Sequence, residues 1–335
     1  MTTFPDGVYQ YGGVPVGVGR LSEIFEAGNI WFVDNDNGSS AYTGKRPDWA
    51  FDLPSTAVAA ASKGGVIYIR PRTTTASADN KYTDNVTIPA TKCMLSLIGA
   101  GNGYPAYRGA VNMVPSTTTT HTINVQASGC SIENMTFDHT TATAGNAINC
   151  VRSATIQAIC LTVKNCRFLG NTILPGSDGT TVTGTIGLGS AQYSHIEDNV
   201  FLKCSSGITM WATSGSPMSI IIRRNVFSGM VLSRDCDIVI GISDIQSTGH
   251  VIADNIFADG LPNMSTGSYK DFIHDCYAVT SVATGIICGN HFATLTPSEM
   301  HTDGTECTLA AGWFLTGNFY GGVTATAPYG LATKV

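Results

Sequence analysis

The stretches SIIIRRNVF (219–227), HVIADNIF (250–257) and GIICGNHF (285–292) decide the fold of this 335-residue chain. Each ends in an aromatic residue, and the same spacing occurs seven times along the sequence. The aromatic residues are Phe137, Phe168, Phe201, Phe227, Phe257, Phe292 and Tyr320, and five positions before them stand Ile132, Val163, Ile196, Ile222, Ile252, Ile287 and Leu315. Two positions before the last five aromatic residues stand Asn199, Asn225, Asn255, Asn290 and Asn318. A repeat of roughly 30 residues indicates a stack of similar units.

The composition of these repeats favours coils of a β-solenoid over helix pairs or propeller blades. Their residues are mainly β-branched or aromatic and are interrupted by Asn and Gly, which suits strands and tight turns. Coils stacked ~4.8 Å apart would place equivalent side chains in columns, Ile on Ile, Phe on Phe and Asn on Asn. We expect the Ile and Phe columns to fill a core and the Asn column to share amide hydrogen bonds. We also expect each Asn to take the left-handed backbone conformation between two strands.

Two further columns carry charges of alternating sign. Four positions before the aromatic residue stand Glu133, Lys164, Glu197 and Arg223, and three positions before it stand Asn134, Asn165, Asp198, Arg224 and Asp254. Opposite charges on neighbouring strands are mildly favourable. We therefore expect both columns to form solvent-facing ladders on one outer edge of the solenoid.

The segment from Ile30 to Gly103 resembles the opening of right-handed parallel β-helix proteins of the pectate-lyase-like superfamily. The resemblance is carried by WFVDNDNG (31–38), TGKRPDWAFDLPSTAVAAAS (43–62), GGVIYIRP (64–71), DNVTIP (84–89) and LSLIGAGNG (95–103). It implies an all-β, single-stranded, right-handed parallel β-helix with a short N-terminal helix capping the coil stack. It implies little about function, because this fold hosts lyases, hydrolases, epimerases and non-enzymatic virion parts.

The chain is expected to have three parts: an N-terminal arm (1–28), the parallel β-helix (29–322) and a C-terminal cap or tail (323–335). The arm combines Pro, Gly, Val and Tyr without a period. It is interpreted either as a disordered lead-in or as an extended arm that docks on a partner, and its apolar residues favour docking. The candidate docking residues are Phe4, Tyr9, Tyr11, Val14 and Val16. This part is similar to the openings of β-helix proteins attached to phage particles. The C-terminal part would cover the open strand edge of the last coil.

The low charge of the chain predicts that part of its lateral surface is covered. Charged residues make up 13% of the sequence, against about 25% in ordinary proteins. Self-association in a closed ring is the simplest cover, and the resemblance to fibrous β-helix virion proteins implies a homotrimer. The net charge of −6 and the lack of a basic run disfavour nucleic acid as a partner. No apolar stretch approaches the ~20 residues of a membrane span, and the N-terminus lacks the features of a signal peptide.

The ten cysteines form no Cys-x-x-Cys pair, so zinc and redox motifs are not supported. Their apolar surroundings predict buried free thiols, which fits folding in a reducing cytoplasm. The stretch Asp34-Asn35-Asp36-Asn37-Gly38 has some features of a calcium loop, but its Gly comes one position early and the distal Glu is absent. We favour a turn there. The sequence predicts no metal site and no cofactor.

Catalysis on this scaffold would need paired carboxylates. Asp198 and Asp254 share a column two coils apart, a separation that suits an inverting glycosidase. Arg224 lies between them, and we expect it to pair with both and to lower their pKa values, so that neither serves as a general acid. A salt-bridged ladder is the favoured interpretation.

The remaining candidates are Asp235 and Asp237, the group Asp271, His274 and Asp275 in one long insertion, and Trp211 as a sugar-stacking or subunit-contact residue. Either acidic group could be a catalytic site, and either could be ordinary loop polarity.

Two functions stay open. The first is a structural or attachment protein of a phage particle, such as a capsid decoration protein, head fibre or short tailspike, made in the host cytoplasm. It would be a homotrimer, would reach other virion proteins through its arm, and its outer loops would meet surface glycans. The second is a polysaccharide lyase or glycoside hydrolase, free or as a depolymerising spike. The lack of a clear carboxylate cluster favours the first, non-enzymatic function.

Overall fold

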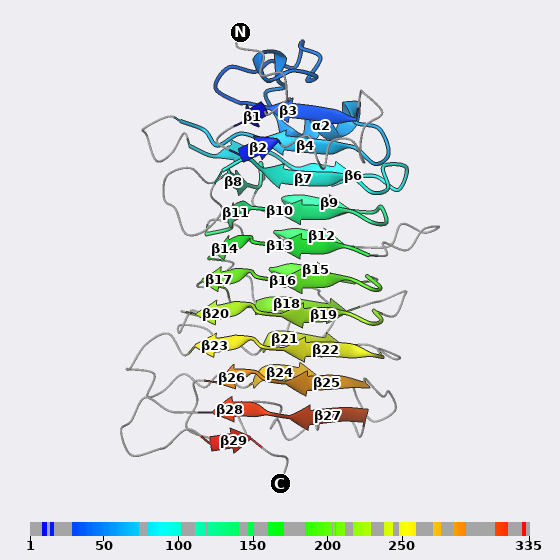
Figure 1. Cartoon of the computed structure of the whole chain (residues 1–335), viewed down its shortest axis with the longest axis vertical. Coiled ribbons are helices and arrows are strands. Elements are labelled where there is room, and N and C mark those ends of the chain that lie inside the picture. The colour runs from blue at the N-terminus through cyan, green and yellow to red at the C-terminus, as the bar shows by residue number, and fades with distance from the viewer. Residues whose placement is uncertain are drawn as a thin grey trace.

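The chain winds into coils that add one strand to each of three long sheets, forming a rod (Figure 1). The computed structural model describes residues 9–11, 14–16, 29–73, 80–101, 111–117, 120–140, 147–150, 160–170, 185–189, 191–202, 204, 206–211, 217–228, 238–243, 248–258, 271–275, 284–292, 312–320 and 330–332. Within these residues the coil strands of each sheet pair in parallel, as a right-handed β-helix requires. The fold class predicted from the sequence is confirmed.

The three sheets are named here by the order in which each coil visits them. Sheet I contains β3 (Ile30–Val33), β4 (Val66–Ile69), β7 (Ser96–Gly99), β10 (Ser131–Glu133), β13 (Thr162–Lys164), β16 (His195–Glu197), β19 (Ile221–Arg223), β22 (His250–Ala253), β25 (Thr284–Cys288) and β27 (Gly312–Thr316). Sheet II contains β5 (Tyr82–Thr83), β8 (Val111–Val114), β11 (Met135–Asp138), β14 (Arg167–Leu169), β17 (Val200–Leu202), β20 (Val226–Ser228), β23 (Ile256–Ala258), β26 (His291–Phe292), β28 (Asn318–Tyr320) and β29 (Gly330–Ala332). Sheet III contains β6 (Val86–Ile88), β9 (Ile123–Val125), β12 (Ile148–Cys150), β15 (Ile186–Leu188), β18 (Ser206–Trp211), β21 (Ile238–Ser243) and β24 (Asp271–Asp275).

The register matches the columns predicted from the sequence. Ile222 pairs with Ile196 on one side and with Ile252 on the other, and Phe227 lies between Phe201 and Phe257 in the same way. The phenylalanine rings from Phe137 to Phe292 stack with centroids 4.6 to 5.2 Å apart. Because both columns are buried, they form a continuous core along the rod.

From β10 onward, one left-handed residue follows each strand of sheet I, where the coil turns toward sheet II. It is Asn134, Asn165, Asp198, Arg224 or Asp254, followed by Gly289 and Gly317 in the last two coils. We expected the repeated Asn residues from Asn199 to Asn318 to be left-handed. This expectation is wrong, because the left-handed residue is the one just before each of them. The Asn side chains are instead buried in the core.

The N-terminal end of the rod is covered by a short helix, α2 (Pro54–Ala60), as expected. It is preceded by a 3-10 turn, η1 (Pro47–Trp49). Proline suits the first position of a helix, and the Asp84 carboxylate accepts a hydrogen bond from the Ser55 amide at 2.8 Å. Ala57 and Val58 are buried against the first coils. The helix thus shields the open end of the core. Across the described residues, no helix has the length and apolar character needed to cross a membrane.

The two ends of the chain add strands outside the regular coils. In the arm, β1 (Tyr9–Tyr11) and β2 (Val14–Val16) pair antiparallel as a small sheet of their own, while Phe4 lies outside the described residues. At the other end, β29 pairs antiparallel with β28 and so lies along the last strand of sheet II. The boundaries at 28/29 and 322/323 stay predictions.

Candidate functional site

The charged cluster at the corner between sheets I and II contains the first candidate acid, Asp198. His195 and Glu197 lie on β16, Arg223 ends β19, and Asp198 and Arg224 are the left-handed turn residues that follow these two strands. Parallel pairing of Glu197 with Arg223 sets acid beside base in neighbouring coils. Alternating signs in the sequence therefore become ion pairs through the stacking register.

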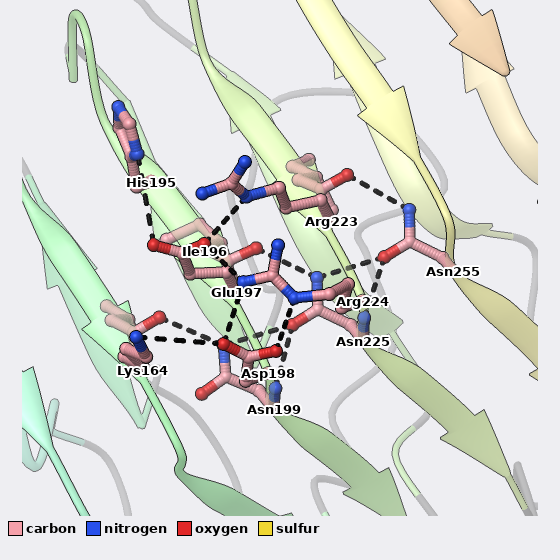
Figure 2. Close-up of polar contacts among 12 residues, drawn as sticks. Lys164, His195, Ile196, Glu197, Asp198, Asn199, Arg223, Arg224, Asn225 and Asn255 are labelled. Atoms are coloured by element: carbon pink, nitrogen blue, oxygen red, sulfur yellow. Dashed lines mark hydrogen bonds and ion pairs between the residues drawn. The ribbon is translucent and has the colours of Figure 1, made fainter. Parts of the chain in front are cut away.

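Two arginines hold two carboxylates in this cluster (Figure 2). Arg224 Nε donates to Asp198 Oδ1 at 2.7 Å, and its Nη2 donates to Asp198 Oδ2 at 2.9 Å. The same Nη2 lies 2.7 Å from Glu197 Oε2, which also accepts a hydrogen bond from Arg223 Nε at 2.7 Å. Lys164 Nζ lies farther away, 3.9 Å from Asp198 Oδ2. The cluster is a closed charge network with a two-pronged contact at its centre.

The carboxylates of this network are poor proton donors. Hydrogen bonding from Arg224 lowers the pKa of Asp198, with help from the positive charges of Arg224 and Lys164. For Glu197, burial is the largest influence and raises the pKa, but hydrogen bonds from Arg223 and Arg224 together outweigh it and lower the pKa. A general acid needs a raised pKa. The expectation that arginine would disable Asp198 agrees with this geometry.

Two details differ from the expected ladder. Arg224 pairs with Asp198 and Glu197, whereas no ion pair joins it to Asp254 among the described residues. Arg224 does not pair with Asp254 because its guanidinium points toward the preceding coil, where it contacts the carboxylates of Asp198 and Glu197. Glu197 was expected to face solvent, yet it is only 7% exposed, because the two arginine side chains lie over it.

Asp254, the second candidate acid, lies on the exposed side of the corner two coils beyond Asp198. Its Oδ1 atom lies beside Gly289, where a Cβ atom would collide with it. The structure thus separates the two candidate acids by the arginine of the intervening coil and gives them different surroundings. The catalytic role of Asp198 and Asp254 stays a prediction.

A ladder of asparagine amides lies directly beneath this corner. Asn225 Nδ2 donates to the Ile196 carbonyl at 2.8 Å and to Asn255 Oδ1 at 3.0 Å. Its own Oδ1 accepts hydrogen bonds at 3.0 Å from the backbone amide and from Nδ2 of Asn199. The pattern continues through Asn290 to Asn318, and all five side chains are buried. The predicted amide ladder is confirmed, and it fixes the position of the charged corner.

A second charged network, at the N-terminal coils, was missed as a network by sequence reasoning. Asp34 accepts a hydrogen bond from Arg70 Nη1 at 2.6 Å, and Asp36 contacts Arg72 Nε at 3.3 Å and Thr73 Oγ1 at 2.8 Å. The signal was present, because β3 pairs with β4 so that Val33 faces Ile69. Continuing that register places each aspartate opposite an arginine 36 positions later.

The same network explains the stretch at 34–38. Asp34 Oδ1 accepts the backbone amide of Asp36 at 3.0 Å, which closes a turn, as favoured from the sequence. Burial raises the pKa of Asp36, but hydrogen bonds from Thr73 and Arg72 together lower it below its ordinary value. Within the described part of the chain, no three His, Cys, Asp or Glu side chains converge as metal ligands would.

Of the remaining candidates, the group at 271–275 was expected in an insertion loop, but its backbone pairs with β21 as a strand. Asp235 and Asp237 lie outside the described residues. The backbone of Asp271, His274 and Asp275 forms β24, and that of Trp211 ends β18, both in sheet III. The predicted catalytic roles of these residues stay predictions.

The cysteine prediction is correct for part of the set. Cys130, Cys150, Cys166 and Cys204 are buried free thiols, whereas Cys160 is exposed. Burial raises the pKa of Cys130 to about 11 and that of Cys166 to about 12. Cys160 is a left-handed residue two positions before β13.

Comparison with known proteins supports the fold and not a reaction. No protein-family model matches the sequence, and no curated protein matches it. Among solved structures, the pectin methylesterase from Aspergillus niger in its deglycosylated form is 13% identical, with a TM-score of 0.51, over 89% of this chain and 87% of that chain. Pectate lyase Pel9A is 14% identical, with a TM-score of 0.42, over 78% and 62%. ORF18 of Geobacillus virus E2 is 11% identical, with a TM-score of 0.37, over 94% and 65%.

Only the similarity to the pectin methylesterase has a TM-score above 0.5 among these three. At 13% identity it supports the fold alone. It agrees with the parallel β-helix described above. The chain is a right-handed parallel β-helix with the fold of the pectate-lyase-like proteins.

Proposed function

We propose that this protein is a structural and attachment component of a phage particle, built as a homotrimeric β-helix rod. The observation that carries the proposal is the arginine clamp on Asp198 and Glu197. At the corner where the sequence offered a catalytic carboxylate, both acids are committed to structural ion pairs. The cluster contributes to the rigidity of the rod and has no proton to give at neutral pH.

Three further observations support a virion role. Residues 1–28 resemble the openings of β-helix proteins attached to phage particles, and the arm would join other virion proteins of the capsid or tail. The described cysteines are free thiols, which fits a protein folded in the host cytoplasm. The core is continuous from the first coils to the last, as a load-carrying rod needs. Loops along the rod would meet glycans of the host surface.

A cleavage assay tests the non-catalytic part of the proposal. The purified full chain is incubated with bacterial and plant polysaccharides, and both reducing ends and the absorbance of unsaturated uronides are followed. We expect no product above a buffer control. Cleavage that disappears in Asp198→Asn, Asp254→Asn or Asp235→Asn protein would contradict the proposal and establish a lyase or glycosidase.

A truncation tests attachment. Deletion of residues 2–20 removes Phe4, Tyr9, Tyr11, Val14 and Val16 while leaving every coil of the rod intact. We expect the shortened protein to keep its fold and its assembly state but to be absent from purified particles. Particles that still incorporate it would show that the arm is not the anchor.

A further inference from the structure

Two buried histidines join neighbouring coils of the rod through their ring nitrogens. His139 directly follows β11, and His250 is the first residue of β22. Each residue is only 1% exposed, although histidine is the side chain that ordinarily gains its charge in mildly acidic solution. The surroundings of these two rings therefore decide how the rod responds to acid.

The ring of His139 has a hydrogen-bond partner for only one of its two nitrogens. Its Nε2 atom lies 2.5 Å from Oγ1 of Thr122, a fully buried residue at the same corner between sheets II and III one coil earlier. Its Nδ1 atom is buried and has no hydrogen-bond partner in the part of the chain that the structure describes. A protonated imidazole has two N–H donors and no acceptor. Protonation would therefore leave a second donor and a full charge in the core without a partner.

The charged groups near His139 do not offset its burial. The carboxylate of Asp138 already accepts hydrogen bonds from Lys81 Nζ at 2.7 Å and from Thr140 Oγ1 at 2.7 Å. Burial is the largest influence and lowers the pKa of His139 to about 4, while the charge of Asp138 raises this pKa and that of His121 lowers it. The ring of His139 is therefore neutral in the folded protein at pH 7.

The ring of His250 accepts a hydrogen bond from the backbone of the preceding coil. Its Nδ1 atom accepts the Ile220 amide at 3.3 Å, so this nitrogen carries no proton. The ring also stacks on Trp313 with centroids 6.1 Å apart, and Gly285, which lies between them in the sheet, has no side chain to separate them. Burial lowers the pKa of His250 to about 4, and no charged group of the described residues shifts it. A proton on Nδ1 would break the hydrogen bond and set two donors against each other.

We infer that His139 and His250 are acid-sensitive links between coils, whose protonation opens the stack at these two places while the coils between them stay paired. This inference goes beyond the proposed function and does not depend on it. In an opened coil the rings take up a proton near their ordinary pKa of 6.5, whereas in the folded rod they do so only near pH 4. The stabilisation is therefore complete above about pH 6.5 and is lost as the pH falls toward 4.

Hydrogen–deuterium exchange of the full chain at pH 7, 6 and 5 tests the inference. Protection of the backbone amides, corrected for the intrinsic exchange rate, is followed by mass spectrometry. In the wild type, protection of 120–140 and of 248–258 should fall about tenfold per pH unit between pH 6 and pH 5, because each opening is coupled to the uptake of one proton. Segment 160–170, which lies between the two links along the rod, should keep its protection.

Variants that cannot titrate show which histidine is responsible. In His139→Gln the acid-induced loss should disappear from 120–140 and remain in 248–258, and His250→Asn should give the reverse. The Gln amide replaces Nε2 of the ring and the Asn amide replaces Nδ1, so each variant keeps a polar atom at the position that bonds to the preceding coil. His195→Gln is the matched control, because the His195 side chain is 40% exposed, and it should leave both losses unchanged.

Three outcomes would overturn the inference: unchanged protection of the wild type at pH 5, an equal loss in 160–170, and losses that persist when the local histidine is replaced. Should a variant not fold, the wild type alone decides. Exchange of the imidazole Cε1 hydrogen, followed by mass spectrometry, reports the protonation of each histidine. Its midpoint should lie below pH 6 for His139 and His250, and a midpoint at pH 6 or above for either ring would contradict the inference. The cleavage and particle assays are independent of this result, so a wrong inference leaves the virion role standing.

Discussion

At the scale of single residues, the buried asparagines stabilise the rod through hydrogen bonds that span three coils. Asn225 joins the Ile196 carbonyl in one coil to the Asn255 amide in the next, and it also accepts two hydrogen bonds from Asn199. Leaving a buried polar group without a partner costs about 1–3 kcal/mol. The ladder therefore penalises any slip of one coil against another.

Replacing the central rung tests this role. Asn225→Ala should lower the free energy of unfolding by about 3 kcal/mol or more, because four hydrogen bonds are lost inside the core. Asn225→Asp has the same shape but places an oxygen opposite the Ile196 carbonyl and Asn255 Oδ1, so we expect it to be at least as damaging. Urea denaturation measures both variants. A mild effect of Asn225→Asp beside a large effect of Asn225→Ala would show that packing, and not hydrogen bonding, sets the cost.

The arginine clamp on Glu197 predicts a specific dependence on pH. Folding lowers the pKa of Glu197 below its ordinary value of 4.5. The resulting stabilisation is therefore complete above about pH 4.5 and is lost as the pH falls through the lower, folded-state value. Glu197→Gln should destabilise the protein by about 1 kcal/mol at pH 7, and its urea midpoint should approach that of the wild type near pH 3.

The control for this prediction is Glu133→Gln. Glu133 occupies the same column two coils earlier and has no ion pair among the described residues. Its substitution should shift the urea midpoint little at either pH. Equal effects of the two substitutions at pH 7 would mean that the clamp contributes no stability.

At the scale of strands and turns, the sequence predicted the columns well because stacking requires the same type of residue at the same position of every coil. The positions of Ile222 and Phe227 follow from spacing alone, since a core column must be apolar in each rung. The left-handed residue was misplaced by one position because both Asn and its predecessor suit such a turn. Arg224 occupies that position in one coil, where side-chain preference alone gives no hint.

A glycine in the second complete coil shows how closely the coils pack. Gly99 ends β7, and a Cβ atom there would collide with the backbone oxygen of Asn134 in the next coil. A collision with backbone cannot be relieved by turning a side chain. Gly99→Ala should therefore destabilise the protein by about 3 kcal/mol or prevent soluble expression.

Gly64→Ala is the contrasting variant for this element. Gly64 has a left-handed φ of 73°, but no atom lies within 4 Å of the added methyl group. Its cost should be limited to backbone strain of roughly 1 kcal/mol. Thermal and urea denaturation compare the two variants, and a larger loss in Gly64→Ala would contradict the close approach at Gly99.

At the scale of the whole molecule, the rod has one continuous core of stacked columns along its axis. The core could be predicted because its columns are continuous in the sequence. Outward apolar residues could not be told from core residues by composition, since Ile221 and Ile222 look alike until the pairing of β19 fixes which one faces outward. The ion pairs of Asp34 and Asp36 likewise needed the register of the first two coils.

The sequence predicted that charged residues of the candidate site form ion pairs, but not all of the partners in these pairs. Alternating charges in the columns indicated a ladder, and Asp198 does pair with Arg224. The choice of Glu197 instead of Asp254 as the second partner depends on which way a long side chain turns, which spacing does not encode. At this corner the carboxylates of Asp198 and Glu197 are paired with arginines.

A crystal structure of the purified full chain is the measurement on which the whole interpretation depends. It should show Ile222 between Ile196 and Ile252, with the Asn225 amide bonded to both neighbouring asparagines. Ile222 and Ile252 in unrelated environments, or a mainly helical chain, would contradict the in-register stack and every inference built on it.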